Sequence, residues 1–371
     1  MSPFDRLARK TVGAFAPYKP GTSVAEVQRR YGFTHPVKLS QNENPLGTSP
    51  RALEALHRID RLSDYDEDDH AALRARLGRP YGLAPDRVIL GHGSNELIAL
   101  AYTAFVDPGD EVVMAKPSFG LFRKDADIAG AHAIEIPLAD GVHDLDAMLN
   151  AVTIRTKLVF VCDPNNPTGT RVERAAFVRF ASILPERVLL VIDQAYREFM
   201  DDAGTDGVTV LAERPTTLVL RTCSKVYGLA SVRFGYGYAA PELIAMLNRV
   251  RVPFNVARPA AQAVLAALDD DAFIARSREN NERGKAFLTR EFARLGLGSY
   301  PSSANFVAVE VPVAADVAYE ALMQRGVIVR SGDGLHLPRH LRVSIGLPEE
   351  NQAFVAALEE LLPQWNALGA A

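Results

Sequence analysis

A lysine lies among small and polar residues in the stretch TCSKVYGLASVR, residues 222–233. Lys225 has hydroxyl side chains close by, at Thr222 and Ser224, and a second cation at Arg233. Two hydroxyls and a planar guanidinium suit a phosphate group. A partly buried lysine beside another cation has a pKa below its usual value of about 10.4, so its neutral amine can attack an aldehyde and form a Schiff base. A solvated surface lysine is the alternative interpretation.

Polar loops follow several predicted strands. The pairs of strand and loop are VIL and GHGSNE (88–96), KLVFVC and DPNNPTGT (157–170), RVLLVI and Asp193, and TLVLRT and CSK (217–225). In open α/β sheets, ligands bind beyond the carboxyl ends of the strands. The backbone N–H groups, amide, carboxylate and amine of these loops suit a phosphorylated aromatic cofactor with a carbonyl group.

Each of these loops has a second interpretation. The glycines before NELI can face an anion, or Ser94 or Asn95 can simply cap a helix. Asp193 is either a helix N-cap or a buried anion that needs a positive partner, such as a protonated pyridine nitrogen. Asn166 either belongs to a turn or hydrogen-bonds a ring hydroxyl with its amide.

The elements that must position these residues alternate between strands and helices. Predicted strands are 88–90, 111–115, 132–138, 157–162, 187–193, 217–222 and 234–239, with helices at 95–105, 174–184 and 241–250 between some of them. Most of these strands are apolar without strict alternation, which indicates burial on both faces of a mainly parallel, seven-stranded α/β sheet. A helical stretch (259–295), strands at 305–311, 327–330 and 341–346, and a last helix (348–361) predict a smaller α+β domain. We therefore expect an N-terminal arm (1–44) that packs with the small domain, a large domain (45–254) and a small domain (255–371).

Composition excludes several classes of protein. The 371 residues carry a net charge of −4, so neither nucleic acid nor a membrane surface is an expected partner. Two cysteines provide no disulfide framework, and the N-terminus lacks the apolar core of a signal peptide. The sequence predicts a cytoplasmic protein without a metal site.

DPNNPTGT, VIDQAY and RTCSKVYGLASVRFGYGYA, in this order and spacing, resemble the fold-type I pyridoxal-phosphate (PLP) aminotransferases. KLSQNENPLGTSP, APYKPG, PSSANF and LRVSIGLPEEN are similar to the histidinol-phosphate aminotransferase branch. The resemblance covers nearly the whole chain.

The resemblance implies a role in cofactor binding for eleven residues. Lys225 would hold PLP covalently, Asp193 would pair with the pyridinium nitrogen, and Phe119 would stack on the ring. Asn166 and Tyr196 would hydrogen-bond the phenolic oxygen, and Tyr196 is counted with Lys225 and Asp193 as catalytic. The phosphate would be bound by Ser94, Asn95, Thr222, Ser224 and Arg233, and by Tyr65 of a neighbouring subunit, so a homodimer is implied.

The resemblance also implies a substrate and a reaction. Arg342 would bind the acidic end of the substrate, with Arg330, Tyr18 and Asn44 as further substrate-binding residues. Lys225 would move the α-proton as general base. The implied reaction is ping-pong transamination between histidinol phosphate and 2-oxoglutarate in histidine biosynthesis.

Departures from the family pattern keep other substrates open. Gln194 replaces the usual glutamate, Phe119 the usual ring-stacking tyrosine, and Asp66 a common proline. The loop 331–340 lies between the two arginines that would bind the substrate. The alternatives are transamination of phenylalanine or another aromatic amino acid, decarboxylation of threonine phosphate, and a PLP-binding sensor without catalysis.

A nicotinamide dehydrogenase is a further alternative, because residues 235–240 match G-x-G-x-x-A. The match lies late in the large domain rather than in its first crossover unit, and no acidic residue ends a following strand. The glycines are better explained by a strand that passes close to the cofactor site.

Overall fold

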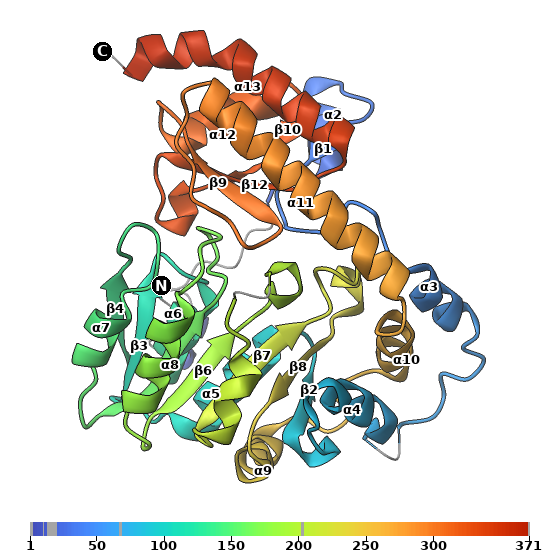
Figure 1. Ribbon diagram of the computed structural model, residues 1–371, viewed down its shortest axis with the longest axis vertical. Coiled ribbons are helices and arrows are strands. Elements are labelled where there is room, and N and C mark those ends of the chain that lie inside the picture. Colours follow the sequence, from blue (N-terminus) through green and yellow to red (C-terminus); the bar gives the residue numbers. More distant parts are fainter. Residues whose placement is uncertain (1–2, 10, 13–20, 67–68, 202–203, 370–371) are drawn as a thin grey trace.

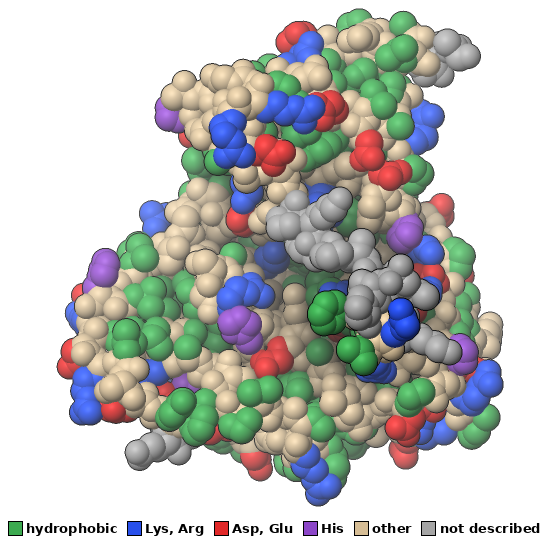
Figure 2. All heavy atoms as spheres, turned by 180° about the vertical axis from the view of Figure 1, so that it is seen from behind, with side chains coloured by type: hydrophobic (Ala, Val, Ile, Leu, Met, Phe, Trp, Pro, Cys, Tyr) green, Lys and Arg blue, Asp and Glu red, His purple; other side chains and the backbone are tan. Residues whose placement is uncertain are grey.

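The computed structural model describes residues 3–9, 11–12, 21–66, 69–201 and 204–369. Figure 1 shows a larger part, built around one wide sheet, below a smaller part that carries the C-terminus, and the long helix α11 (Asp271–Arg294) runs between them. Among the described helices, none combines the length and the apolar character that crossing a bilayer requires. On the face seen in Figure 2, acidic and basic side chains are interspersed.

The wide sheet has seven strands in the order β2-β8-β7-β6-β5-β3-β4. They are β2 (Val88–Gly91), β3 (Glu111–Lys116), β4 (His132–Pro137), β5 (Thr156–Cys162), β6 (Leu189–Asp193), β7 (Thr217–Thr222) and β8 (Gly235–Tyr238). β8 runs antiparallel to β2 and β7, and the other adjacent pairs are parallel. The predicted mainly parallel, seven-stranded α/β sheet is confirmed.

The strands of this sheet are apolar on both sides because helices cover both faces of the sheet. Val159 and Val161 of β5 belong to one buried cluster, whereas Leu158 and Phe160 belong to a second one on the other face. The helices of the first cluster are α3 (Pro50–His57), α4 (Ala71–Gly78), α7 (Leu145–Asn150), α8 (Arg174–Ile183) and α10 (Arg258–Ala267). Those of the second cluster are α5 (Ser94–Phe105), α6 (Leu121–Ala129) and α9 (Pro241–Val250). Every residue of β2, β6, β7 and β8 is buried, as the lack of alternation predicts.

The smaller part is built around an antiparallel sheet in the order β11-β12-β9. Its elements are β9 (Phe306–Glu310), α12 (Ala315–Met323), β10 (Val327–Ile328), β11 (Arg330–Ser331), β12 (His340–Ser344) and α13 (Pro348–Gly369). Helices α11, α12 and α13 cover this sheet around a core of their own, which includes Phe292, Phe354 and Trp365. The described residues also form short 3₁₀ turns at Arg79–Tyr81, Pro85–Arg87, Arg197–Phe199, Gly207–Ala212, Ala230–Val232 and Asp333–Leu335.

Two elements of the N-terminal segment, α2 (Val24–Tyr31) and β1 (Val37–Lys38), pack on the smaller part, and β1 pairs in parallel with β10. The segment also contains the short helix α1 (Pro3–Leu7). Val27 of α2 is fully buried against Met323 and Ile328.

The predicted helix over 259–295 is wrong in one respect, because the structure has two helices there. α10 ends at Ala267, and the Asp270 carboxylate accepts a hydrogen bond from the Phe273 N–H at the start of α11. Ser49 also donates to Asp270, at 2.6 Å. An aspartate that caps the next helix favours a new start over a continuous helix.

The domain boundary between 254 and 255 remains a prediction. α10 follows that boundary, yet its Ala263 and Val264 belong to the core of the wide sheet. We propose that the division falls within α11 instead.

A substitution at Phe160 tests the packing on the second face of the wide sheet. Its ring is fully buried and stacks on Phe122 and Tyr102, with centroids 4.5 and 5.4 Å away. We expect Phe160→Ala to lower the free energy of unfolding by about 3–5 kcal/mol in urea denaturation, because a cavity replaces the ring. Val178→Ala, at a side chain that is 41% exposed, should change it by less than about 0.5 kcal/mol. Equal effects would contradict the assigned packing.

Candidate active site

The predicted site residues come from both parts of the molecule. Asn166, Asp193 and Lys225 follow or end the adjacent strands β5, β6 and β7, so they lie along one edge of the sheet. Arg342 comes from β12 of the smaller part, and its Nη1 donates to the Asn166 Oδ1 at 2.7 Å. That contact joins the strand edge to the smaller part.

Lys225 is half-buried at the centre of this arrangement. Its Nζ donates to the Gln41 carbonyl at 3.4 Å and lies 5.6 Å from the centre of the Tyr196 ring. Burial lowers its pKa to about 8, and the nearby cations Arg342 and Arg233 act in the same direction. A substantial fraction of the amine is therefore neutral near physiological pH, as a nucleophile or general base requires.

Asp193 is a buried carboxylate at the end of β6. No helix begins at Asp193, so of its two interpretations the helix N-cap is wrong. Its Oδ1 accepts from the Ala195 N–H at 3.1 Å, and the described residues supply no salt bridge to it. Burial raises its pKa to about 6, against the effects of the Ala195 N–H and the charge of Lys225. A cationic ligand would relieve the cost of this buried charge.

Hydroxyls, a guanidinium and a helix start gather beside Lys225. The Ser224 N–H donates to Thr222 Oγ1 at 3.1 Å, and both residues are buried. Ser94 begins α5, a helix that has no side-chain cap at its N-terminus. Arg233 adopts a left-handed backbone with a φ of 57° and donates from Nη1 to the Ala230 carbonyl.

Two glycines allow these groups to approach one another. A Cβ at Gly93 would lie 2.6 Å from Arg233 Nη2, and one at Gly235 would lie 2.2 Å from the Ser94 nitrogen. Gly93 also has a φ of 79°, which side chains rarely adopt. Gly235 thus lets β8 pass close to the start of α5.

The remaining predicted residues differ in their burial and in the contacts they make. Phe119 follows β3 and packs edge-to-face on Phe122, while Asn95 is partly buried in the first turn of α5. Arg330 faces Arg342 across the register of β11 and β12. Tyr65 lies on the surface and is 72% exposed. Tyr18 lies outside the described residues.

The side chain of Asn44 forms hydrogen bonds within the protein. Its amide donates to the Val226 carbonyl and to Ser277 Oγ, at 2.8 and 2.9 Å, and its Oδ1 accepts from the Leu46 N–H. Substrate binding by Asn44 remains a prediction, and these contacts favour a role in anchoring the segment.

The segment Ser40–Asn42 also belongs to the site, although none of its residues is predicted as a site residue. The Ser40 carbonyl accepts from Arg342 Nη2 at 2.8 Å, the Gln41 carbonyl accepts from Lys225, and the Asn42 amide donates to the Tyr196 hydroxyl at 2.9 Å. The prolines and glycines of the first 40 residues predict an arm over the surface instead. The motif SQNEN was noted only as part of the family resemblance.

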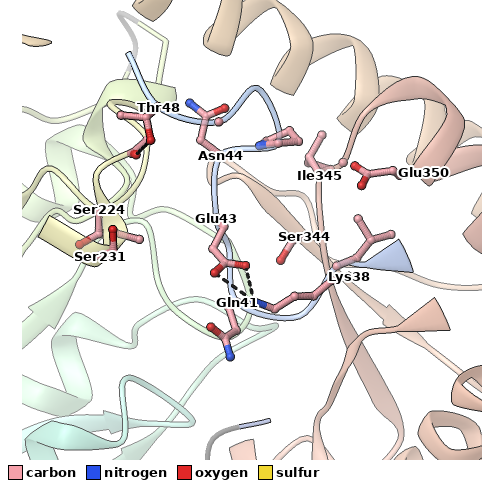
Figure 3. Close-up of a pocket in the computed structure, with 16 residues that line it drawn as sticks. Lys38, Gln41, Glu43, Asn44, Thr48, Ser224, Ser231, Ser344, Ile345 and Glu350 are labelled. Carbon is pink, nitrogen blue, oxygen red and sulfur yellow. Dashed lines mark hydrogen bonds and ion pairs between the residues drawn. The ribbon is translucent and has the colours of Figure 1, made fainter. Parts of the chain in front are cut away.

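A cavity of about 360 Å³ lies beside this segment. Figure 3 shows Ser224, Ser231 and Thr48 on one side of it and Ser344, Ile345 and Glu350 on the other. Lys38 and Glu43 form an ion pair in between, at 2.8 Å. The chain that carries Gln41 and Asn44 thus runs between the two parts of the molecule.

The lowered pKa of Lys225 can be tested in the protein without cofactor. We expect the rate of its modification by trinitrobenzenesulfonate, followed by peptide mass spectrometry, to rise with pH around a midpoint of about 8. Since Arg342 disfavours the ammonium form, Arg342→Gln should move the midpoint upward. A midpoint at the ordinary value of 10.5, or no response to Arg342→Gln, would contradict the assigned environment.

Comparison with known proteins agrees with this geometry. The family model for aminotransferase class I and II matches residues 34–358. The chain is 42% identical to the histidinol-phosphate aminotransferase of Moorella thermoacetica, over 95% of this chain and 92% of the relative. It is 45% identical to histidinol-phosphate aminotransferase 2 of Ralstonia nicotianae, over 96% and 97%. The crystal structure of histidinol-phosphate aminotransferase from Sinorhizobium meliloti in complex with pyridoxal-5'-phosphate superposes with a TM-score of 0.86 at 28% identity, and the match covers 95% of this chain and 99% of that one. The chain belongs to the aminotransferase class I and II family, as the motifs around Lys225 predict.

Proposed function

We propose that this protein is a PLP-dependent aminotransferase that transfers the amino group of histidinol phosphate to 2-oxoglutarate. The observation that carries the proposal is the half-buried Lys225 amine, whose pKa is lowered to about 8 beside Arg342 and Arg233. The names of the relatives support the same reaction. The pathway supported is histidine biosynthesis.

The residues at the strand edge fit the cofactor. Asp193 offers a buried carboxylate to a protonated pyridine nitrogen, and its burial makes that ionic contact strong. Arg233, Thr222, Ser224 and the start of α5 offer donors to a phosphate. The cofactor, when bound, supplies an aldehyde for Lys225 and an electron-withdrawing ring.

Each side chain at the strand edge would have its own role in the reaction. Lys225 would hold the cofactor, and its free amine would take the proton from the substrate's α-carbon as a general base. Asp193 keeps the ring nitrogen protonated. Tyr196 and Asn166 would hydrogen-bond the ring oxygen, and Phe119 and Asn95 would complete the cofactor site. The reaction is expected to be ping-pong, because one site serves the amino donor and then the 2-oxo acid.

The substrate preference rests on two arginines. Arg342 and Arg330 are register partners on β12 and β11, so two cations are available to the acidic end of the substrate. Guanidinium groups bind phosphate and carboxylate bidentately. A phosphate can use both arginines at once, which favours histidinol phosphate over phenylalanine.

We also propose a cytoplasmic homodimer in which Tyr65 reaches the cofactor phosphate of the neighbouring subunit. Tyr65 stacks on Phe254 with centroids 4.5 Å apart, and the two rings are 72% and 59% exposed. Phe254 also adopts a left-handed φ of 57°, which is strained for a bulky residue. An exposed aromatic pair with this strain suits a buried position in a dimer.

The substrate proposal is tested by half-reactions. Protein loaded with PLP is mixed separately with histidinol phosphate and with phenylalanine, and the loss of the visible cofactor band is followed by stopped flow. We expect histidinol phosphate to react more than about tenfold faster, since charge-assisted hydrogen bonds are worth about 1.5–3 kcal/mol. Arg330→Gln should remove most of that preference and leave the rate with phenylalanine little changed.

The controls separate the chemistry from the specificity. Lys225→Ala should form no such band and give no reaction with either amine. A faster reaction with phenylalanine would overturn the substrate proposal alone, whereas an unchanged band in Lys225→Ala would overturn the role of Lys225.

Tyr65→Phe tests the dimer. We expect this variant to remain dimeric in sedimentation but to lose PLP about tenfold more readily in equilibrium dialysis, because one phosphate hydrogen bond of about 1.5 kcal/mol is removed. A monomeric wild-type protein, or equal retention of PLP by the variant, would contradict the proposal.

A further inference from the structure

Asn42 is a buried polar residue that lies between the two parts of the candidate site. Only 1% of it is exposed, and it adopts a left-handed φ of 55°, a conformation that asparagine tolerates better than most residues. Asn305 donates to its carbonyl at 3.0 Å. Its side chain contacts Tyr196, which follows β6 of the wide sheet, and Ser344 of β12.

The hydrogen bonds of Asn42 determine how its side-chain amide is oriented. The Ser344 hydroxyl oxygen accepts from the Asn42 backbone N–H at 2.8 Å, and the Ser344 proton is donated to Asn42 Oδ1 at 2.9 Å. The oxygen of the amide therefore faces Ser344. The Nδ2 group faces the Tyr196 hydroxyl, to which it donates at 2.9 Å.

This orientation determines what the Tyr196 hydroxyl can do. A phenol has one proton to donate, and its oxygen also accepts. The hydroxyl of Tyr196 accepts from Asn42, and no acceptor for its own proton occurs among the described residues. That proton is left for a group in the site, where Lys225 Nζ lies 5.6 Å from the centre of the Tyr196 ring.

Ser344 connects this arrangement to the substrate end of the site. Arg342 and Ser344 are two positions apart on β12, so their side chains point to the same face of the sheet. The Arg342 guanidinium is held by the carbonyl of Ser40, two residues before Asn42. Segment 40–42 thus joins the groups on β12 to Lys225 and Tyr196.

We infer that Asn42 is a positioning residue that makes the Tyr196 hydroxyl a hydrogen-bond donor to the ring oxygen of the cofactor and ties this donor to β12. The inference rests on the proposed function, because it concerns the cofactor held by Lys225. The donated hydrogen bond stabilises negative charge on the ring oxygen. It thereby lowers the affinity of the neighbouring Lys225 nitrogen for its proton.

The test is a spectroscopic pH titration that does not depend on turnover. Protein loaded with PLP is titrated, and the pH midpoint of the change in its visible band is recorded for the wild type, Asn42→Gly, Tyr196→Phe and the double variant. Glycine removes the side chain without adding strain at a positive φ. Asn351→Ala is the matched control, because Asn351 is also buried with two hydrogen bonds but contacts Gly346 instead of Tyr196.

We expect Asn42→Gly to raise the midpoint by about 0.5 to 1 pH unit, which corresponds to about 0.7–1.4 kcal/mol. Tyr196→Phe should raise it at least as much, and adding Asn42→Gly to Tyr196→Phe should cause no further shift. Asn351→Ala should lower the thermal stability of the cofactor-free protein and leave the midpoint unchanged. Should Asn42→Gly fail to fold, Ser344→Ala frees the amide and should raise the midpoint in the same direction.

The outcomes separate the inference from the proposed function. If the wild type titrates and Tyr196→Phe shifts the midpoint, but Asn42→Gly or its substitute Ser344→Ala does not, the inference fails and the proposed function stands. Additive shifts in the double variant would also overturn it, because Asn42 would then act independently of Tyr196. A wild-type protein without a Lys225-dependent band would overturn the proposed function and the inference together.

Discussion

The chemistry of the site depends on a lysine amine that is kept partly uncharged by its surroundings. Burial disfavours the ammonium form of Lys225, and two cations, Arg342 and Arg233, disfavour it further. Asp193 opposes them, but its own charge is buried and costly. The same burial that frees the amine therefore also makes the Asp193 charge costly, a cost that a cationic ligand would relieve.

That environment requires the two parts of the molecule to be docked. The sheet supplies Lys225 and Asp193 from adjacent strand ends, and both of these strands, β7 and β6, are buried along their whole length. The smaller part supplies Arg342, whose guanidinium reaches the Asn166 amide. Segment Ser40–Asn42 lies between them, and each of its residues hydrogen-bonds one of the groups at the centre. Moving the smaller part away would break these contacts and expose the amine to water.

The sequence predicts the elements whose physical signal is local. Continuous apolar runs identify the strands because both faces of the sheet are covered, and the polar residues that follow them mark the edge where the site lies. The interpretation of Asp193 stayed open because a carboxylate after a strand also suits a helix cap. In the structure no helix begins there.

Features that depend on distant contacts could not be predicted in this way. Asn42 stands in a run of polar residues and proline that favours an exposed turn, yet its partners are Tyr196, Asn305 and Ser344. The break between α10 and α11 is set by the Asp270 cap and by Ser49, which is more than 200 residues away in the chain. The packing of α10 on the core of the wide sheet likewise depends on α3, far from it in sequence.

The most direct test of the account is to find which side chain carries the cofactor. The protein would be loaded with PLP, reduced with borohydride, digested and mapped by mass spectrometry. We predict a single reduced adduct, on the peptide that contains Lys225. An adduct on another lysine in place of Lys225, or no adduct at all, would contradict the assignment on which the site, the proposed reaction and the role of Asn42 depend.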